Sequence, residues 1–150
     1  MATKNKKHKQ QVRRLAFNQK NTLALADQIF SDRGGVVSLL KLCHGTLANG
    51  KDGGRTTHCA VGEAYFHFVN HNLGNVNRAE DPTASAIDAL VQVSVLKKDT
   101  PANRKKLGTA LDSAVGANDD TDEGDDLASF VERSRLVADV FRKKVAPLLK

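Results

Sequence analysis

The residue types best suited to chemistry gather in one short stretch of the chain. Both cysteines and two of the five histidines fall within residues 43–59, as Cys43-His44 and His58-Cys59 on either side of a glycine-rich segment. A zinc site needs a tetrahedral set of thiolate or imidazole ligands, commonly in pairs separated by roughly two to four residues. Adjacent helical residues point apart, so each pair offers one ligand to a given ion. Burial as a small apolar side chain is the simpler interpretation of each cysteine.

The same stretch offers a nucleophile. Cys59 falls in the first turn of a predicted helix, where the helix dipole and free amide groups favour a thiolate. With His58 beside it and His44 across the loop, a Cys–His pair is a hypothesis for catalysis, although no third group that would orient the base is evident. A disulfide between Cys43 and Cys59 is a further hypothesis for oxidising conditions, since an intracellular chain keeps its thiols reduced.

A second set of polar side chains follows at helical spacing. Glu63, His67 and His71 are four residues apart, so a helix turns all three toward roughly one face. Histidines at this spacing can chelate a divalent metal, but the order differs from the His-Glu-x-x-His pattern of zinc proteases. A metal site is one hypothesis, and a polar stripe with a paired, buried Glu63 is the other. No phosphate-binding glycine loop accompanies these residues, and no cofactor is expected.

An acidic tract occupies residues 119–126, with six carboxylates in eight positions. An EF-hand loop needs a glycine at its sixth position and a glutamate at its twelfth. Aligning Gly124 with that glycine puts Phe130 in the place of the glutamate, so the tract does not match a calcium loop. Acids ahead of a helix stabilise its N-terminal end. Mimicry of phosphates toward a basic partner is the functional alternative.

Charge is segregated along the chain. The net charge of +6 combines +7 in residues 1–20, −6 in residues 21–132 and +5 in residues 133–150. Cations that neutralise phosphates release counterions, so basic ends favour a nucleic-acid or nucleoprotein partner, while solubilising ends are the alternative. With no Trp, one Tyr and six Phe, the chain lacks a base-stacking platform, and contact with the phosphate backbone is expected. The residues expected to make it are Lys4, Lys6, Lys7, Lys9, Arg13, Arg14, Arg142, Lys143 and Lys144.

Apolar residues at helical spacing dominate the rest of the chain. They predict an all-α, compact single-domain bundle of about six helices, with residues 1–9 as a basic flexible tail and residues 10–150 as one domain. The expected helices cover about residues 10–30, 36–43, 58–71, 82–95, 101–116 and 125–145.

Capping signals set several of these boundaries. Thr56 or Thr57 is expected to cap the third helix, and the pairs Asp81-Pro82 and Thr100-Pro101 begin the next two. Gly116 is expected to end the second of these. Residues 47–54 are interpreted as a loop, although Asn49-Gly50 is a hairpin signal. Facing the core in the fourth helix are Ile87, Leu90, Val91 and Val95.

Two segments of the Cys–His region form a recognisable pattern. These are Leu42-Cys43-His44-Gly45-Thr46-Leu47-Ala48 and, after the glycine-rich loop, His58-Cys59-Ala60-Val61-Gly62-Glu63-Ala64-Tyr65. Together they resemble a small family of uncharacterised bacterial and phage proteins, whose members join a small-Gly-x-Leu-Ala segment to a Cys-Ala-hydrophobic-Gly helix start. His58 replaces the aromatic residue that often precedes the cysteine. The resemblance implies a compact helical domain with Cys59 and Gly62 as packing positions, and it implies no activity.

These patterns predict a non-enzymatic helical binding protein that acts on nucleic acid or a nucleoprotein complex through its basic ends. Small size and separated charges are typical of a phage or mobile-element accessory factor, including an anti-CRISPR-like inhibitor. Two alternatives stay open: a small metal- or cysteine-dependent enzyme using residues 43–71, and a homo-oligomeric assembly subunit whose partner is protein. No apolar run approaches the roughly 20 residues that cross a bilayer, so a cytoplasmic protein without membrane contact is expected.

Overall fold

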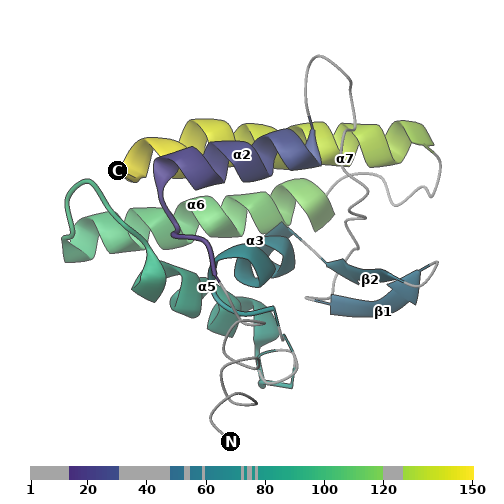
Figure 1. Ribbon diagram of the computed structural model, residues 1–150, viewed down its shortest axis with the longest axis horizontal. Coiled ribbons are helices and arrows are strands. Elements are labelled where there is room, and N and C mark those ends of the chain that lie inside the picture. Colours follow the sequence, from purple (N-terminus) through teal and green to yellow (C-terminus); the bar gives the residue numbers. More distant parts are fainter. Residues whose placement is uncertain are drawn as a thin grey trace, which may run out of the picture.

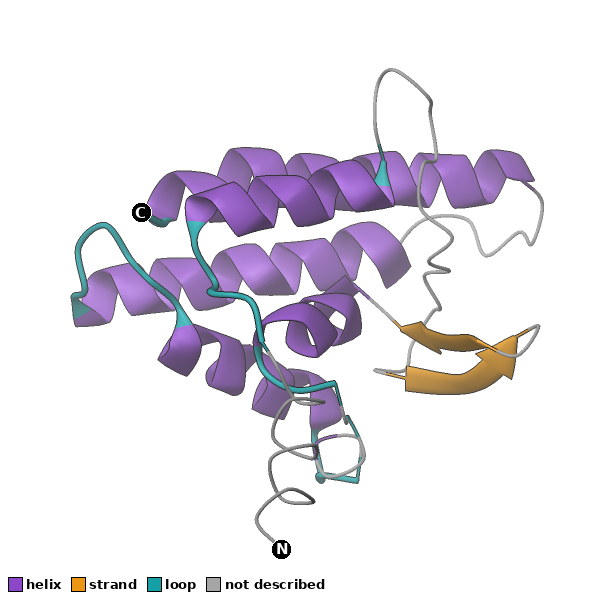
Figure 2. Cartoon of the chain, in the orientation of Figure 1, coloured by secondary structure: helices purple, strands orange, loops and turns teal. Residues whose placement is uncertain are grey.

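Helices make up most of the described part of the chain. The computed structural model describes residues 14–30, 48–52, 55–58, 60–71, 73, 76, 78–119 and 127–150. Their elements are α2 (Gln19–Ile29), β1 (Ala48–Asp52), β2 (Arg55–His58), α3 (Ala60–Phe68), α5 (Pro82–Val93), α6 (Pro101–Asp119) and α7 (Leu127–Val140), then a π-helical segment η1 (Phe141–Val145) and a 3-10 turn η2 (Ala146–Leu148) (Figures 1 and 2). The predicted mostly helical fold is confirmed.

The helices enclose one apolar core. α6 packs against α7 on one side and against α3 and α5 on the other, while α2 lies on α7 and η1 (Figure 1). None of the described helices is long and apolar enough to span a membrane. The large apolar side chains with almost no exposed surface are Phe17, Ile29, Val61, Phe68, Leu90, Leu107, Leu111, Val137, Phe141 and Leu149.

The two proline-marked helix starts are confirmed. An Asp81 carboxylate oxygen accepts a hydrogen bond from the Ala84 amide at 3.2 Å, and the Thr100 hydroxyl accepts one from the Asn103 amide at 3.1 Å. These bonds satisfy amide groups that the helix leaves free. The predicted helix ends were less accurate: α5 stops at Val93, and α6 passes Gly116 and continues to Asp119.

The side chains of α5 follow the predicted inward face in part. Leu90 is fully buried, and Ile87 and Val91 are partly buried against the core. Val95 does not face inward, because it follows the end of α5 in an extended segment and is 38% exposed.

The predicted first helix starts too early. Residues 14–18 are not helical, and α2 begins at Gln19, where Asn18 caps it by accepting from the Asn21 amide at 2.9 Å. Just before the cap, Phe17 is 1% exposed and pairs with Ser94 in an isolated parallel bridge. Burial of Phe17 in an extended conformation explains the late start. The predicted helix over residues 36–43 and the tail over residues 1–9 lie outside the described residues.

Residues 48–52 and 55–58 form two antiparallel strands, so the predicted loop over residues 47–54 is wrong for residues 48–52. Ala48 pairs with His58 and Asp52 with Arg55, with a register shift between Asn49 and Lys51. Asn49-Gly50 is therefore part of β1, and residues 53–54, which lie between the two strands in sequence, are outside the described residues.

This strand pair also changes the start of the following helix. Thr56 and Thr57 lie in β2 rather than at a helix cap, and α3 begins at Ala60. It ends at Phe68, before His71. The predicted helix over residues 58–71 is therefore correct in its centre and wrong at both ends.

Three chain segments meet at one end of the helical body, where Figure 1 shows the start of α2, the connection from α5 to α6 and the C-terminus. We call them the junction: residues 15–19, 94–97 and 148–150. Four backbone hydrogen bonds join them: Val95 N to Phe17 O at 2.9 Å, Lys150 N to Val95 O at 2.9 Å, Gln19 N to Lys150 O at 2.7 Å and Lys97 N to Leu148 O at 2.9 Å. The predicted last helix accordingly loses its regular α-helical form after Val140 and ends in this pairing.

Gly108, in the middle of α6, gives a first prediction. A Cβ atom there would lie 3.8 Å from Ile87 Cγ2, an ordinary van der Waals distance. Because glycine costs a helix interior conformational entropy, Gly108→Ala is expected to raise the free energy of unfolding by about 0.5–1 kcal/mol. Urea unfolding followed by circular dichroism measures the change. A decrease would show that α5 and α6 cannot accommodate the added methyl group.

Candidate functional site

The Cys–His cluster lies mostly outside the described residues. Cys43, His44 and Cys59 are not described, and His58 is the last residue of β2. The zinc, nucleophile and disulfide hypotheses for these residues therefore stay predictions.

Glu63, His67 and His71 do not share a helix face. Glu63 is 1% exposed, and its Oε2 atom lies 3.6 Å from His67 Nε2, one turn along α3. His71 lies beyond the end of α3, where its ring stacks on Phe66 with centroids 4.7 Å apart. The described residues contain no group of three His, Cys, Asp or Glu side chains that could hold a metal ion. The arrangement supports the alternative of a buried, paired Glu63.

The basic residues near the N-terminus are described only in part. Lys4, Lys6, Lys7, Lys9 and Arg13 lie outside the described residues. Arg14 is described and is exposed, three residues before the buried Phe17. Its exposure is compatible with a binding role, and the basic tail itself stays a prediction.

Arg142 binds within the protein. Its Nη2 atom donates to Asp27 Oδ1 at 2.8 Å and to the carbonyl oxygen of Phe30, the residue that caps the C-terminus of α2. Nη1 lies 3.9 Å from Asp139, and the side chain is 23% exposed. A cation at this position satisfies a helix-end carbonyl and complements the negative end of the helix dipole. The geometry therefore supports a stabilising role for Arg142 over contact with nucleic acid.

A group of lysines around the junction was not predicted as a site. We call it the basic end, and its members are all exposed. The hydrogen bonds of Lys150 N to Val95 O and of Lys97 N to Leu148 O bring the segment 95–98 beside the C-terminal residues. Asn103 Nδ2 donates to Lys98 O at 2.9 Å, which fixes the start of α6 against the same segment. The basic end comprises Lys20, Lys97, Lys98, Lys105, Lys106 and Lys150.

One acid lies within the basic end and is already paired. Asp99 is the single acidic residue of positions 89–111, and Arg104 donates to both of its carboxylate oxygens, at 2.6 and 3.0 Å. This hydrogen bonding lowers the pKa of Asp99 and raises the pKa of Arg104. Because the two charges compensate each other, the lysines set the sign of the charge here.

A shorter charge window would have found this site in the sequence. Residues 97–106 carry Lys97, Lys98, Arg104, Lys105 and Lys106 against Asp99, a net charge of +4. The sum over residues 21–132 is −6 and conceals that local excess. The sequence does not indicate that Lys20 and Lys150 lie beside this segment, because the junction brings them together from opposite ends of the described chain.

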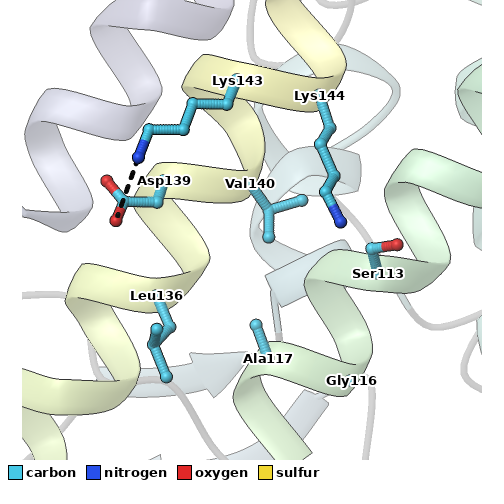
Figure 3. Close-up of a pocket in the computed structure, with 8 residues that line it drawn as sticks. All are labelled: Ser113, Gly116, Ala117, Leu136, Asp139, Val140, Lys143 and Lys144. Carbon is cyan, nitrogen blue, oxygen red and sulfur yellow. Dashed lines mark ion pairs between the residues drawn. The ribbon is translucent and has the colours of Figure 1, made fainter.

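A groove of about 500 Å³ lies between α6 and the α7–η1 segment (Figure 3). Its lining residues are Ser113, Gly116, Ala117, Leu136, Asp139, Val140, Lys143 and Lys144. Lys143 and Lys144, both predicted to bind a partner, are exposed on its rim. A second cavity of about 600 Å³ between α5 and α6 combines Asp88 and Asp112 with Arg104 and Lys105, so it favours neither sign of charge.

Comparison of the chain with known proteins found no similar sequence or structure. The chain matches no family model, no curated protein and no solved structure among those compared with it. Any function must therefore be supported by the charge and geometry of the described residues.

Proposed function

We propose that the protein is a non-enzymatic binding protein whose basic end contacts the phosphate backbone of nucleic acid, free or within a nucleoprotein complex. The observation that carries the proposal is the meeting of three chain segments at the junction, with exposed lysines on or directly after each segment and one internally paired acid. We propose that this binding serves a cytoplasmic accessory role in a phage or mobile element, such as inhibition of a nucleoprotein defence complex.

Phosphate contact follows from the chemistry of the lysines. Each ammonium group that neutralises a phosphate releases condensed counterions, which makes the affinity fall steeply as salt is added. Contacts to phosphates carry no direct sequence information. We therefore expect binding that depends on salt and tolerates changes of base sequence.

The test is fluorescence anisotropy of labelled single- and double-stranded DNA and RNA over about 50 to 200 mM salt. The double variant Lys97→Gln/Lys98→Gln is expected to bind about tenfold more weakly at the lowest salt. The plot of log K against log[salt] should become less steep, its slope falling in magnitude by about 2, because two ammonium groups no longer neutralise phosphates.

A matched control removes the same charge elsewhere. Arg78→Gln/Arg135→Gln takes two cations from outside the basic end, Arg78 lying before α5, whose 12 residues span about 18 Å. This control should retain the affinity and the salt slope. Absence of binding at the lowest salt, or an equal loss in the control, would overturn the proposal. The variant Lys4→Gln/Lys6→Gln/Lys7→Gln/Lys9→Gln measures the share of the N-terminal residues.

A further inference from the structure

The groove between α6 and the α7–η1 segment differs in character along its length. At one end the Lys144 side chain extends from η1 toward Ser113 on α6 (Figure 3). At the other end Leu136 and Ala117 line the two sides, with Val140 between these ends (Figure 3). The groove therefore offers a cation at one end and short aliphatic side chains along the rest.

The two lysines on its rim are not equivalent. Lys143 Nζ lies 4.0 Å from Asp139 Oδ2, and Figure 3 shows its side chain directed to that carboxylate. Lys144 forms no ion pair with another described side chain. Ser113 Oγ already donates to the Thr109 carbonyl at 3.1 Å. The ammonium group of Lys144 is thus the donor that a negatively charged head group would meet.

The lining also limits the kind of anion. A single lysine without an ion pair matches a single negative charge, because the charge of the other rim lysine, Lys143, is compensated by Asp139. None of the described lining residues is aromatic, so a flat ring finds no stacking partner among them. Its volume of about 500 Å³ falls within the range of small-molecule sites.

We infer that this groove binds a small monoanionic amphiphile, with its carboxylate beside Lys144 and an unbranched alkyl chain along Val140, Ala117 and Leu136. Burial of the alkyl chain against these partly exposed aliphatic side chains removes apolar surface from water. The ion pair fixes the direction in which the ligand lies. Neither Lys144 nor the groove belongs to the basic end, so the inference does not depend on binding of nucleic acid.

Decanoate is a suitable probe, used below its micelle concentration. Isothermal titration calorimetry of the full chain should show binding of decanoate, and about tenfold weaker binding of its uncharged methyl ester, because the ester lacks the negative charge that pairs with Lys144. Lys144→Gln should weaken decanoate binding about tenfold for the same reason. Arg135→Gln, which removes one exposed cation from α7 outside the groove lining, is the control with equal charge loss and should leave the affinity unchanged.

A second variant tests the apolar end. Ala117→Leu fills the groove beside Leu136 and should abolish binding, with circular dichroism to check that the variant is folded. Lys144→Gln tests the inference on an exposed residue even where Ala117→Leu fails to fold. The inference is overturned by any of three results: no decanoate binding, equal binding of the methyl ester, or the same loss in Arg135→Gln as in Lys144→Gln.

Discussion

Phe17→Ala is expected to lower the free energy of unfolding by about 3–5 kcal/mol. Phe17 is 1% exposed, and its ring stacks on Phe68 with centroids 4.6 Å apart and planes 14° from parallel. Truncation removes most of a buried aromatic side chain and leaves a cavity that the neighbouring helices can fill only in part. The loss is large compared with the roughly 5–15 kcal/mol by which single domains are stable.

Urea unfolding of Phe17→Ala beside Leu15→Ala measures this effect. Leu15 lies two residues away in the same extended segment but is 49% exposed, so its truncation should change the stability by about 0.5 kcal/mol or less. Hydrogen exchange adds a local measurement, because Val95 N donates to Phe17 O and should lose protection in Phe17→Ala. Equal stability of the two variants would contradict the assignment of Phe17 to the core.

Arg142→Met is expected to destabilise the protein by about 2 kcal/mol. The larger share comes from the charged hydrogen bond to the Phe30 carbonyl, since bonds to charged groups contribute roughly 1.5–3 kcal/mol. The pair with Asp27 contributes less, because Asp27 is 69% exposed and exposed ion pairs contribute about 0–1 kcal/mol. Methionine retains an unbranched apolar side chain, so the variant mainly removes the guanidinium group.

Lys143→Met is the matched control, with the same charge loss at an adjacent residue that is 76% exposed. We expect its stability to stay within about 0.5 kcal/mol of the parent chain. Asp27→Asn separates the ion pair from the carbonyl bond and should cost less than Arg142→Met. If Arg142→Met keeps its stability but loses affinity for DNA, the stabilising role is wrong and Arg142 belongs to the binding surface.

The helix starts of α5 and α6 were predictable because their causes are local. Asp81-Pro82 and Thr100-Pro101 each supply a capping oxygen and a proline without an amide hydrogen, which are properties of neighbouring residues. The start of α2 was not predictable in this way. Apolar spacing continues through residue 17, but pairing with Ser94, distant in sequence, holds Phe17 in an extended form.

The candidate site likewise has a part that local sequence predicts and a part that depends on distant contacts. The net charge of +4 in residues 97–106 is a property of the sequence, but the sum over residues 21–132 is −6 and conceals it. Membership of Lys20 and Lys150 depends on the hydrogen bond of Gln19 N to Lys150 O, which no local pattern indicates. The exclusion of Arg142 likewise depends on Asp27 and Phe30, which are more than 100 residues away.

The junction also constrains the order in which the chain can assemble during synthesis. Gln19 Nε2 donates to the Ala146 carbonyl across 127 positions of sequence, and the strand partners of residues 94–97 include residues 148–150. These contacts cannot form until the last of those residues has left the ribosome. Closing so long a loop adds little equilibrium cost, since each doubling of length costs only about 0.6 kcal/mol, but contacts this distant slow folding. The helices can therefore form before the junction, and Lys20 and Lys150 join the other lysines of the basic end only in a late step of folding.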